Sequence, residues 1–203
     1  MRNKSTIAKL LSEEDINVVQ KQATTASFDV KNRELVLPIW KDEMSDNISD
    51  LLVCHEIGHA LYTSKAMLDK MIERKIEKTF VNVIEDARIE KMVQQKYAGS
   101  RTVFLKGYKE LIDKDFFGTK DKDVNQMLLI DRLNMHFKTS IVKSDVEFTT
   151  AEQLIVKKME NLETFNDVVV LARELSEYCK DEAETKGLDQ HDMADTEDYD
   201  DED

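Results

Sequence analysis

The sequence has few residues that break helices or crosslink a chain: one proline, five glycines and two cysteines among 203 residues. So few breakers favour a mainly helical fold. Two thiols as far apart as Cys54 and Cys179 do not form a disulfide framework. We interpret each as a small core or surface residue rather than a nucleophile, and a reducing cytoplasm as the expected compartment.

Long apolar runs are also missing. No stretch of 18 apolar residues exists, so we expect no membrane-spanning helix. The first fifteen residues lack the apolar core of a signal peptide. Acidic residues outnumber basic ones by 42 to 29, which gives a net charge of −13. This charge argues against nucleic acid or an anionic membrane as a partner.

The negative charge is concentrated at one end of the sequence. Residues 179–203 contain twelve acids and two lysines, and few large apolar side chains. Such a composition is typical of a disordered tail or linker. We therefore expect one folded domain over residues 1–178, followed by an acidic tail over residues 179–203.

Hydrophobic periodicity predicts an α+β fold that is mainly α. A first helix is expected over residues 12–22, and a β-hairpin over 26–30 and 34–40, with Pro38 shifting the second strand towards a sheet edge. Asp46 or Asn47 is expected to cap the following helix. The remaining pattern predicts helices at about 47–63, 66–97, 101–114, 123–138, 147–160 and 165–179.

One motif carries chemistry: His55-Glu56-Ile57-Gly58-His59, an H-E-x-x-H pattern within an apolar helix. Two residues four apart lie about 40° from each other around a helix, so both imidazoles can bind one zinc ion. Glu56 would lie beside the metal, where it can act as a general base. The alternative is a pair of neutral core histidines bonded to carbonyl groups.

A third ligand is needed, and Glu85 is the strongest candidate because it lies in the middle of an apolar helical stripe. The alternative for Glu85 is a buried ion pair with Arg88, which could also orient Glu85 as a ligand. Asp86 and Asn82 are further candidates for supporting the ligands, although Asp86 and Glu90 lie on faces where solvated or paired roles suffice.

The H-E-x-x-H motif followed by a glutamate on a later helix resembles the pattern of gluzincin-type zinc metallopeptidases. The block from Asn82 to Glu90, and then Lys96 to Arg101, is also similar to the N-terminal region of bacterial and phage proteins with a von Willebrand factor type A domain, including cobaltochelatase-like subunits. The resemblance covers about residues 28–110. No von Willebrand domain follows here, which suggests a fragment or a separately encoded partner.

This resemblance implies a zincin-like fold, a Zn²⁺ cofactor and hydrolysis of a protein or peptide substrate, in the host cytoplasm if the protein is phage-encoded. It also implies that the strand over 34–40 is an edge strand that binds extended substrate, and that a histidine or tyrosine stabilises the oxyanion. The available donors are His136, Tyr97 and Tyr108. The alternative function is a non-catalytic, zinc-containing interaction module, working with a von Willebrand factor A-domain protein through the acidic tail and with a chelatase-type ATPase.

Overall fold

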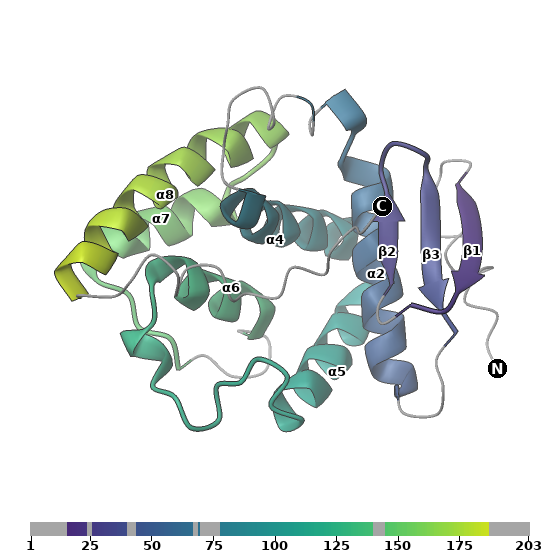
Figure 1. Ribbon diagram of the computed structural model, residues 1–203, viewed down its shortest axis with the longest axis horizontal. Coiled ribbons are helices and arrows are strands. Elements are labelled where there is room, and N and C mark those ends of the chain that lie inside the picture. Colours follow the sequence, from purple (N-terminus) through teal and green to yellow (C-terminus); the bar gives the residue numbers. More distant parts are fainter. Residues whose placement is uncertain are drawn as a thin grey trace. The chain divides into compact units, whose positions relative to one another are not determined.

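The computed structural model describes residues 16–23, 26–39, 44–66, 69, 78–139 and 145–186. Contacts group the chain into two compact units. The first comprises Met1–Lys70 and Ile89–Phe117, and the second comprises Met71–Arg88 and Gly118–Asp203. The described residues form six α-helices and one three-stranded sheet, which confirms the α+β, mainly α prediction (Figure 1).

The sheet of the first unit contains β1 (Asn17–Lys21), β2 (Ser27–Asp29) and β3 (Glu34–Pro38), in the order β1-β3-β2. Strand β1 is parallel to β3, and β2 is antiparallel to it. The predicted hairpin is therefore confirmed. The predicted helix over 12–22 is wrong at residues 17–21, where pairing with β3 and two adjacent β-branched valines favour a strand. The cap signal of that helix, residues 12–15, lies outside the described residues.

Strand β3 is the central strand, so the expectation that Pro38 marks a sheet edge is wrong. Pro38 is the last residue of β3, and the amide of the next residue, Ile39, donates to Lys21 O at 2.8 Å. The proline thus removes one donor without ending the pairing. Because β3 is paired on both sides, it cannot be the edge strand that adds an extended substrate.

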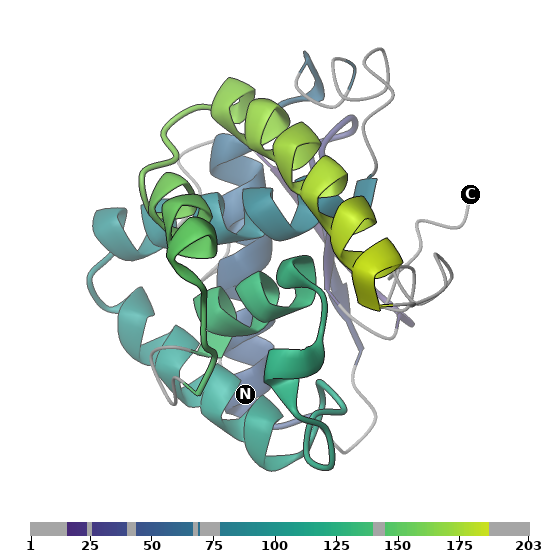
Figure 2. The same ribbon diagram turned by 90° about the vertical axis from the view of Figure 1, so that its left-hand side faces the viewer.

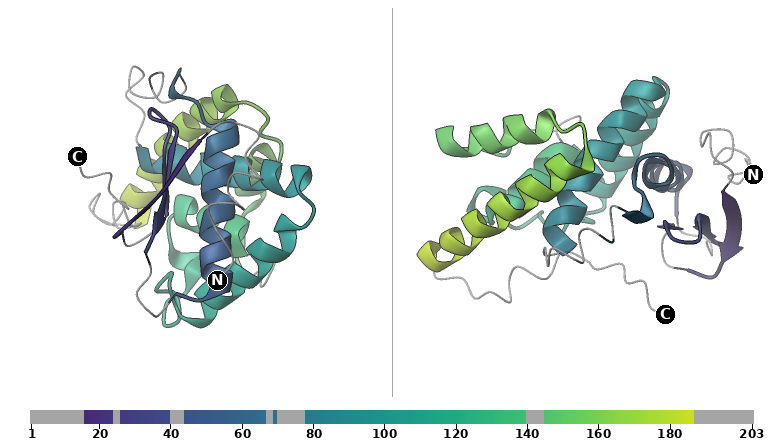
Figure 3. Two further views of the ribbon diagram at one scale, coloured as in Figure 1. Left: turned by 90° about the vertical axis from the view of Figure 1, so that its right-hand side faces the viewer. Right: turned by 90° about the horizontal axis from the view of Figure 1, so that it is seen from above.

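Helix α2 (Asp46–Tyr62) carries the H-E-x-x-H motif and matches the predicted helix over 47–63. Ser45, rather than Asp46 or Asn47, is its N-cap, and Ser45 Oγ accepts a hydrogen bond from Ile48 N at 3.2 Å. The helix lies beside the sheet (Figure 3). An apolar core joins the two, formed by Ile16, Ala26, Leu35, Leu37, Val53, Ile57 and Ala60.

Helix α4 (Lys78–Lys96) is continuous, and α5 (Ser100–Asp113) follows it closely in the chain. Two glycines allow close packing in the first unit. A Cβ atom at Gly107 would lie 2.5 Å from Leu51 Cβ, and one at Gly58 would lie 3.1 Å from Ile89 Cδ1. Gly58 therefore lets the second half of α4 approach the motif helix closely. The first part of the predicted 66–97 helix, residues 67–68 and 70–77, lies outside the described residues.

The second unit contains the helices after residue 118 (Figure 2). The predicted helix over 123–138 is divided into a short 3₁₀ turn, η1 (Val124–Gln126), and α6 (Leu129–Thr139). Helices α7 (Thr150–Glu160) and α8 (Phe165–Lys186) match the remaining two predictions in position. Helix α8 continues to Lys186, so residues 179–186 of the expected tail are helical. Residues 187–203 lie outside the described part.

A buried ion-pair network joins α6, α7 and α8. Arg132 on α6 is 5% exposed and pairs with Glu152 on α7 and with Glu182 on α8. Glu182 also accepts a hydrogen bond from the Leu129 amide at the start of α6, at 2.7 Å. Both cysteines are buried, and burial raises the pKa of Cys179 to about 12. No described helix is long and apolar enough to cross a membrane.

Candidate metal site

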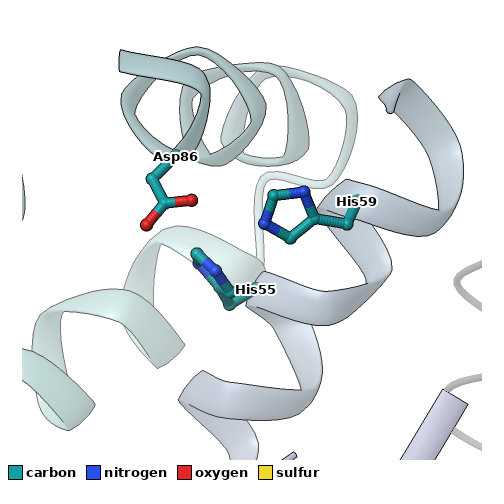
Figure 4. A group of neighbouring side chains, drawn as sticks. All are labelled: His55, His59 and Asp86. Carbon is teal, nitrogen blue, oxygen red and sulfur yellow. The ribbon is translucent and has the colours of Figure 1, made fainter. Parts of the chain in front are cut away.

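His55 and His59 lie on one face of α2, one turn apart, as the H-E-x-x-H spacing predicts. Their ring centroids are 4.9 Å apart, and the ring planes make an angle of 77°. Both residues are partly buried, so each ring keeps some access to solvent. The arrangement lets both rings point towards the same position beside the helix (Figure 4).

The Nδ1 atom of each ring is engaged by the protein. His55 Nδ1 lies 2.9 Å from Glu90 Oε1, and His59 Nδ1 lies 3.0 Å from Thr63 Oγ1. An ionised carboxylate can only accept, so His55 donates from Nδ1 and its proton is placed there. Metal-binding histidines in proteins are typically fixed in this way, which leaves Nε2 as the ligand atom. This arrangement differs from the alternative of histidines bonded to carbonyl oxygens.

Glu90 lies beside His55, and the sequence interpretation gave it no role at the site. It is 5% exposed, and its Oε1 atom also accepts a hydrogen bond from the Tyr108 hydroxyl at 2.5 Å. Tyr108 on α5, Glu90 on α4 and His55 on α2 therefore form one hydrogen-bonded chain within the first unit. The spacing of Asp86 and Glu90, one turn apart on one helix face, is the signal that could have revealed it.

Asp86 completes a cluster with the two histidines. Each of the three side chains offers one ligand atom, and these atoms all lie within 4.8 Å of one another. The Asp86 carboxylate points towards both imidazole rings in Figure 4. Asp86 precedes Glu90 by one turn of the same continuous helix, so the helix that orients His55 also carries the carboxylate.

The donor set fits a transition metal of the zinc type. Two imidazole nitrogens and one carboxylate oxygen are ligands that zinc prefers, and three protein ligands are typical of catalytic zinc sites. Ligand atoms about 2.0–2.1 Å from a tetrahedral zinc lie about 3.4 Å from each other. The spacing of up to 4.8 Å is therefore somewhat wider than a loaded site needs.

Glu85, the predicted third ligand, forms a bidentate ion pair with Arg88. Arg88 Nε lies 2.7 Å from Glu85 Oε2, and Arg88 Nη2 lies 2.7 Å from Glu85 Oε1. Both residues are 3% exposed. Arg88 Nη1 also donates to Glu163 O at 3.2 Å. This ion pair is the alternative that the sequence offered for Glu85. Whether Glu85 also binds a metal stays a prediction, but the structure groups Asp86 with the histidines.

The other predicted residues are placed as follows. Glu56 is 9% exposed on α2, next to His55, and Asn82 is exposed on α4, one turn before Asp86. Tyr97 is partly buried and has Lys96 Nζ 5.6 Å from its ring centroid. Of the three predicted oxyanion donors, Tyr108 is the one whose hydroxyl is hydrogen-bonded into the chain that reaches His55.

His136 lies on α6 among aromatic rings. Its ring centroid is 5.2 Å from that of Phe137 and 5.2 Å from that of Phe148, with edge-to-face geometry. Its Nδ1 atom is buried without a hydrogen-bond partner in the described structure. Burial lowers the pKa of His136, which favours the neutral ring. These surroundings are typical of a core histidine.

Comparisons with protein-family models, with curated proteins and with solved structures found no match for this chain.

Proposed function

We propose that the protein is a zinc-dependent metallopeptidase with a zincin-like arrangement of its motif helix. The observation that carries the proposal is the cluster of His55, His59 and Asp86, whose ligand atoms lie within 4.8 Å of one another. The position of Glu56, directly after the first histidine of the H-E-x-x-H motif, supports hydrolysis rather than metal storage.

His55, His59 and Asp86 would hold the metal, and Glu85 stays the alternative carboxylate. When bound, zinc acts as a Lewis acid that lowers the pKa of water and polarises a carbonyl group. Three protein ligands leave a fourth position for water or substrate, whereas a structural site usually has four protein ligands.

The chain's own groups would position the site and move the proton. Glu90 holds the proton of His55 on Nδ1, and Thr63 fixes the ring of His59. Glu56 would accept a proton from the water molecule that attacks the peptide carbonyl, and would pass this proton to the leaving amine. Its low exposure, 9%, is consistent with a base kept away from bulk solvent.

The test is hydrolysis of a quenched fluorescent casein by the zinc-loaded full chain. We expect the wild type to release fluorescence, and Glu56→Gln to keep its zinc while losing at least about 10²-fold in rate, as for a lost general base. Glu174→Gln is a matched control, because Glu174 pairs with Lys158 at the surface and belongs to no part of the cluster. Equal rates for wild type and Glu56→Gln would contradict the assignment of Glu56.

The acidic segment over residues 187–203 favours a second function, a zinc-containing interaction module without catalysis. A partner with a von Willebrand factor A domain, together with a chelatase-type ATPase, is the expected assembly in that case. Tight zinc binding with no cleavage of casein, and capture of the A-domain partner that is lost when residues 187–203 are removed, would favour this function.

A further inference from the structure

Besides the two histidines, Asp86 has a positively charged neighbour, Lys138. Lys138 Nζ, in the last turn of α6, lies 3.2 Å from Asp86 Oδ2. Both residues belong to the second unit, so the contact lies within one compact part of the chain. The side chains are 22% and 16% exposed, which places the pair at the border between core and solvent. An ammonium group therefore contacts the carboxylate that the metal site is proposed to use.

Two cations near one carboxylate compete for it. A divalent ion at Asp86 would lie close to the Lys138 ammonium, and like charges at such distances repel strongly where water is partly excluded. Lysine has a flexible four-carbon stem and a strongly hydrated head, so Lys138 can move into solvent when the metal arrives. The lysine thereby offsets part of the cost of partly burying the Asp86 carboxylate.

We propose that Lys138 is a built-in competitor that occupies Asp86 in the metal-free protein and lowers the affinity of the site for zinc. This inference rests on the proposed metal site and adds its regulation. Metal uptake becomes coupled to the position of the lysine on α6, so any event that withdraws the ammonium from Asp86 raises zinc affinity.

The test measures zinc affinity of the full-length metal-free protein by competition with a chromogenic chelator. We expect Lys138→Met and Lys138→Gln to bind zinc at least about tenfold more tightly than the wild type. Lys138→Arg keeps the charge and should stay near the wild-type value. Lys158→Met is the matched control, because it removes a lysine that pairs with Glu174 in the same unit, away from the cluster. Its affinity should not change.

The outcomes separate this inference from the proposed function. If the wild type binds zinc and both neutral variants at residue 138 bind it equally or more weakly, the competitor role is overturned while the metal site stands. If Lys138→Met binds zinc and the wild type does not, the inference is supported in its strongest form. If neither wild type nor any variant binds zinc, the metal site itself is wrong, and the competitor role with it. Two neutral variants are used so that a folding defect in one leaves a result from the other.

Discussion

At the scale of single residues, Glu90 links the motif helix to the rest of the first unit. Its Oε1 atom lies within hydrogen-bond distance of both His55 Nδ1 and the Tyr108 hydroxyl. The contact with His55 orients that ring, and the bond from Tyr108 holds the carboxylate in place. Such partners also raise the basicity of the liganding nitrogen, which strengthens the bond to a metal.

Glu90→Gln should therefore weaken zinc binding by about 10–100-fold, the usual cost of losing a group that orients a ligand. Tyr108→Phe should weaken it less, because the carboxylate of Glu90 stays in place. The measurement is chelator competition on folded protein. An unchanged affinity in Glu90→Gln would show that the contact with His55 has no part in metal binding.

Asp86 and Glu85 are adjacent acids with different expected effects. Asp86→Ala should abolish stoichiometric zinc, since it removes a member of the cluster. Glu85→Ala should keep zinc but lose stability of about 3–5 kcal/mol, because it leaves the buried Arg88 without its bidentate partner. Metal content and urea unfolding of both variants check this. The reverse pattern, with zinc lost only in Glu85→Ala, would restore Glu85 as the ligand.

At the scale of elements, α5 packs so closely on α2 that Gly107 has no room for a side chain. A Cβ atom there would lie 2.5 Å from Leu51 Cβ and 3.1 Å from Asn47 O. Overpacking in Gly107→Ala should cost about 1–3 kcal/mol of stability. This cost opposes the roughly 1 kcal/mol that alanine gains over glycine in a helix, and we expect the variant to be less stable than the wild type.

Gly99→Ala is the control for this prediction, because a Cβ atom at Gly99 has nothing within 4 Å. Its stability should be equal to or slightly above that of the wild type. Urea unfolding compares the two variants. A Gly107→Ala protein as stable as Gly99→Ala would contradict the close packing of α2 and α5.

In the second unit, the ionisation of Asp131 on helix α6 should make the stability of the protein depend on pH. Burial and the nearby Glu182 carboxylate raise the pKa of Asp131 to about 6. Because this folded pKa lies above the unfolded value of 3.8, ionising Asp131 costs stability as the pH rises from about 4 through 6. Asp131→Asn should thus be more stable than wild type at pH 8, by an amount on the order of 3 kcal/mol.

The difference between Asp131→Asn and wild type should vanish below about pH 3, where the aspartate is protonated in both the folded and the unfolded state. Urea unfolding at pH 3 and pH 8 gives the comparison. A constant difference at both pH values would show that the mutation acts through packing rather than through the charge of Asp131.

Local sequence patterns predicted the helices well because apolar spacing is a local property. The positions of α2, α5, α7 and α8, and the faces of His55 and His59, follow from it. Strand β1 was mistaken for a helix because its pairing with β3 crosses seventeen positions of sequence, from Asn17 to Glu34, and no local signal reports that partner. The central position of β3 depends on the same long-range pairing.

The prediction of the third metal ligand from local sequence is limited as well. The helical position of Glu85 correctly predicts that this residue lies on a buried face. A buried carboxylate can, however, be paired either with a metal ion or with a positively charged side chain. Arg88 lies three residues on and takes both oxygens of Glu85. Which of two adjacent acids lies near the histidines depends on contacts between residues far apart in sequence, and no local pattern reports those contacts.

At the scale of the whole molecule, the net charge of −13 is concentrated towards the end of the sequence. Nine of the 42 acidic residues of the chain lie in residues 187–203. The acidic composition therefore describes that segment more than the surroundings of the metal site. The proposed chemistry depends instead on two histidines and a carboxylate carried by α2 and α4.

The most direct test of the account is the zinc content of the purified full chain, measured by elemental analysis after expression in zinc-supplemented medium, beside His55→Ala. The account predicts about one zinc per wild-type chain and almost none in a folded His55→Ala protein. A wild-type chain without zinc, or a His55→Ala chain with as much zinc as the wild type, would contradict it.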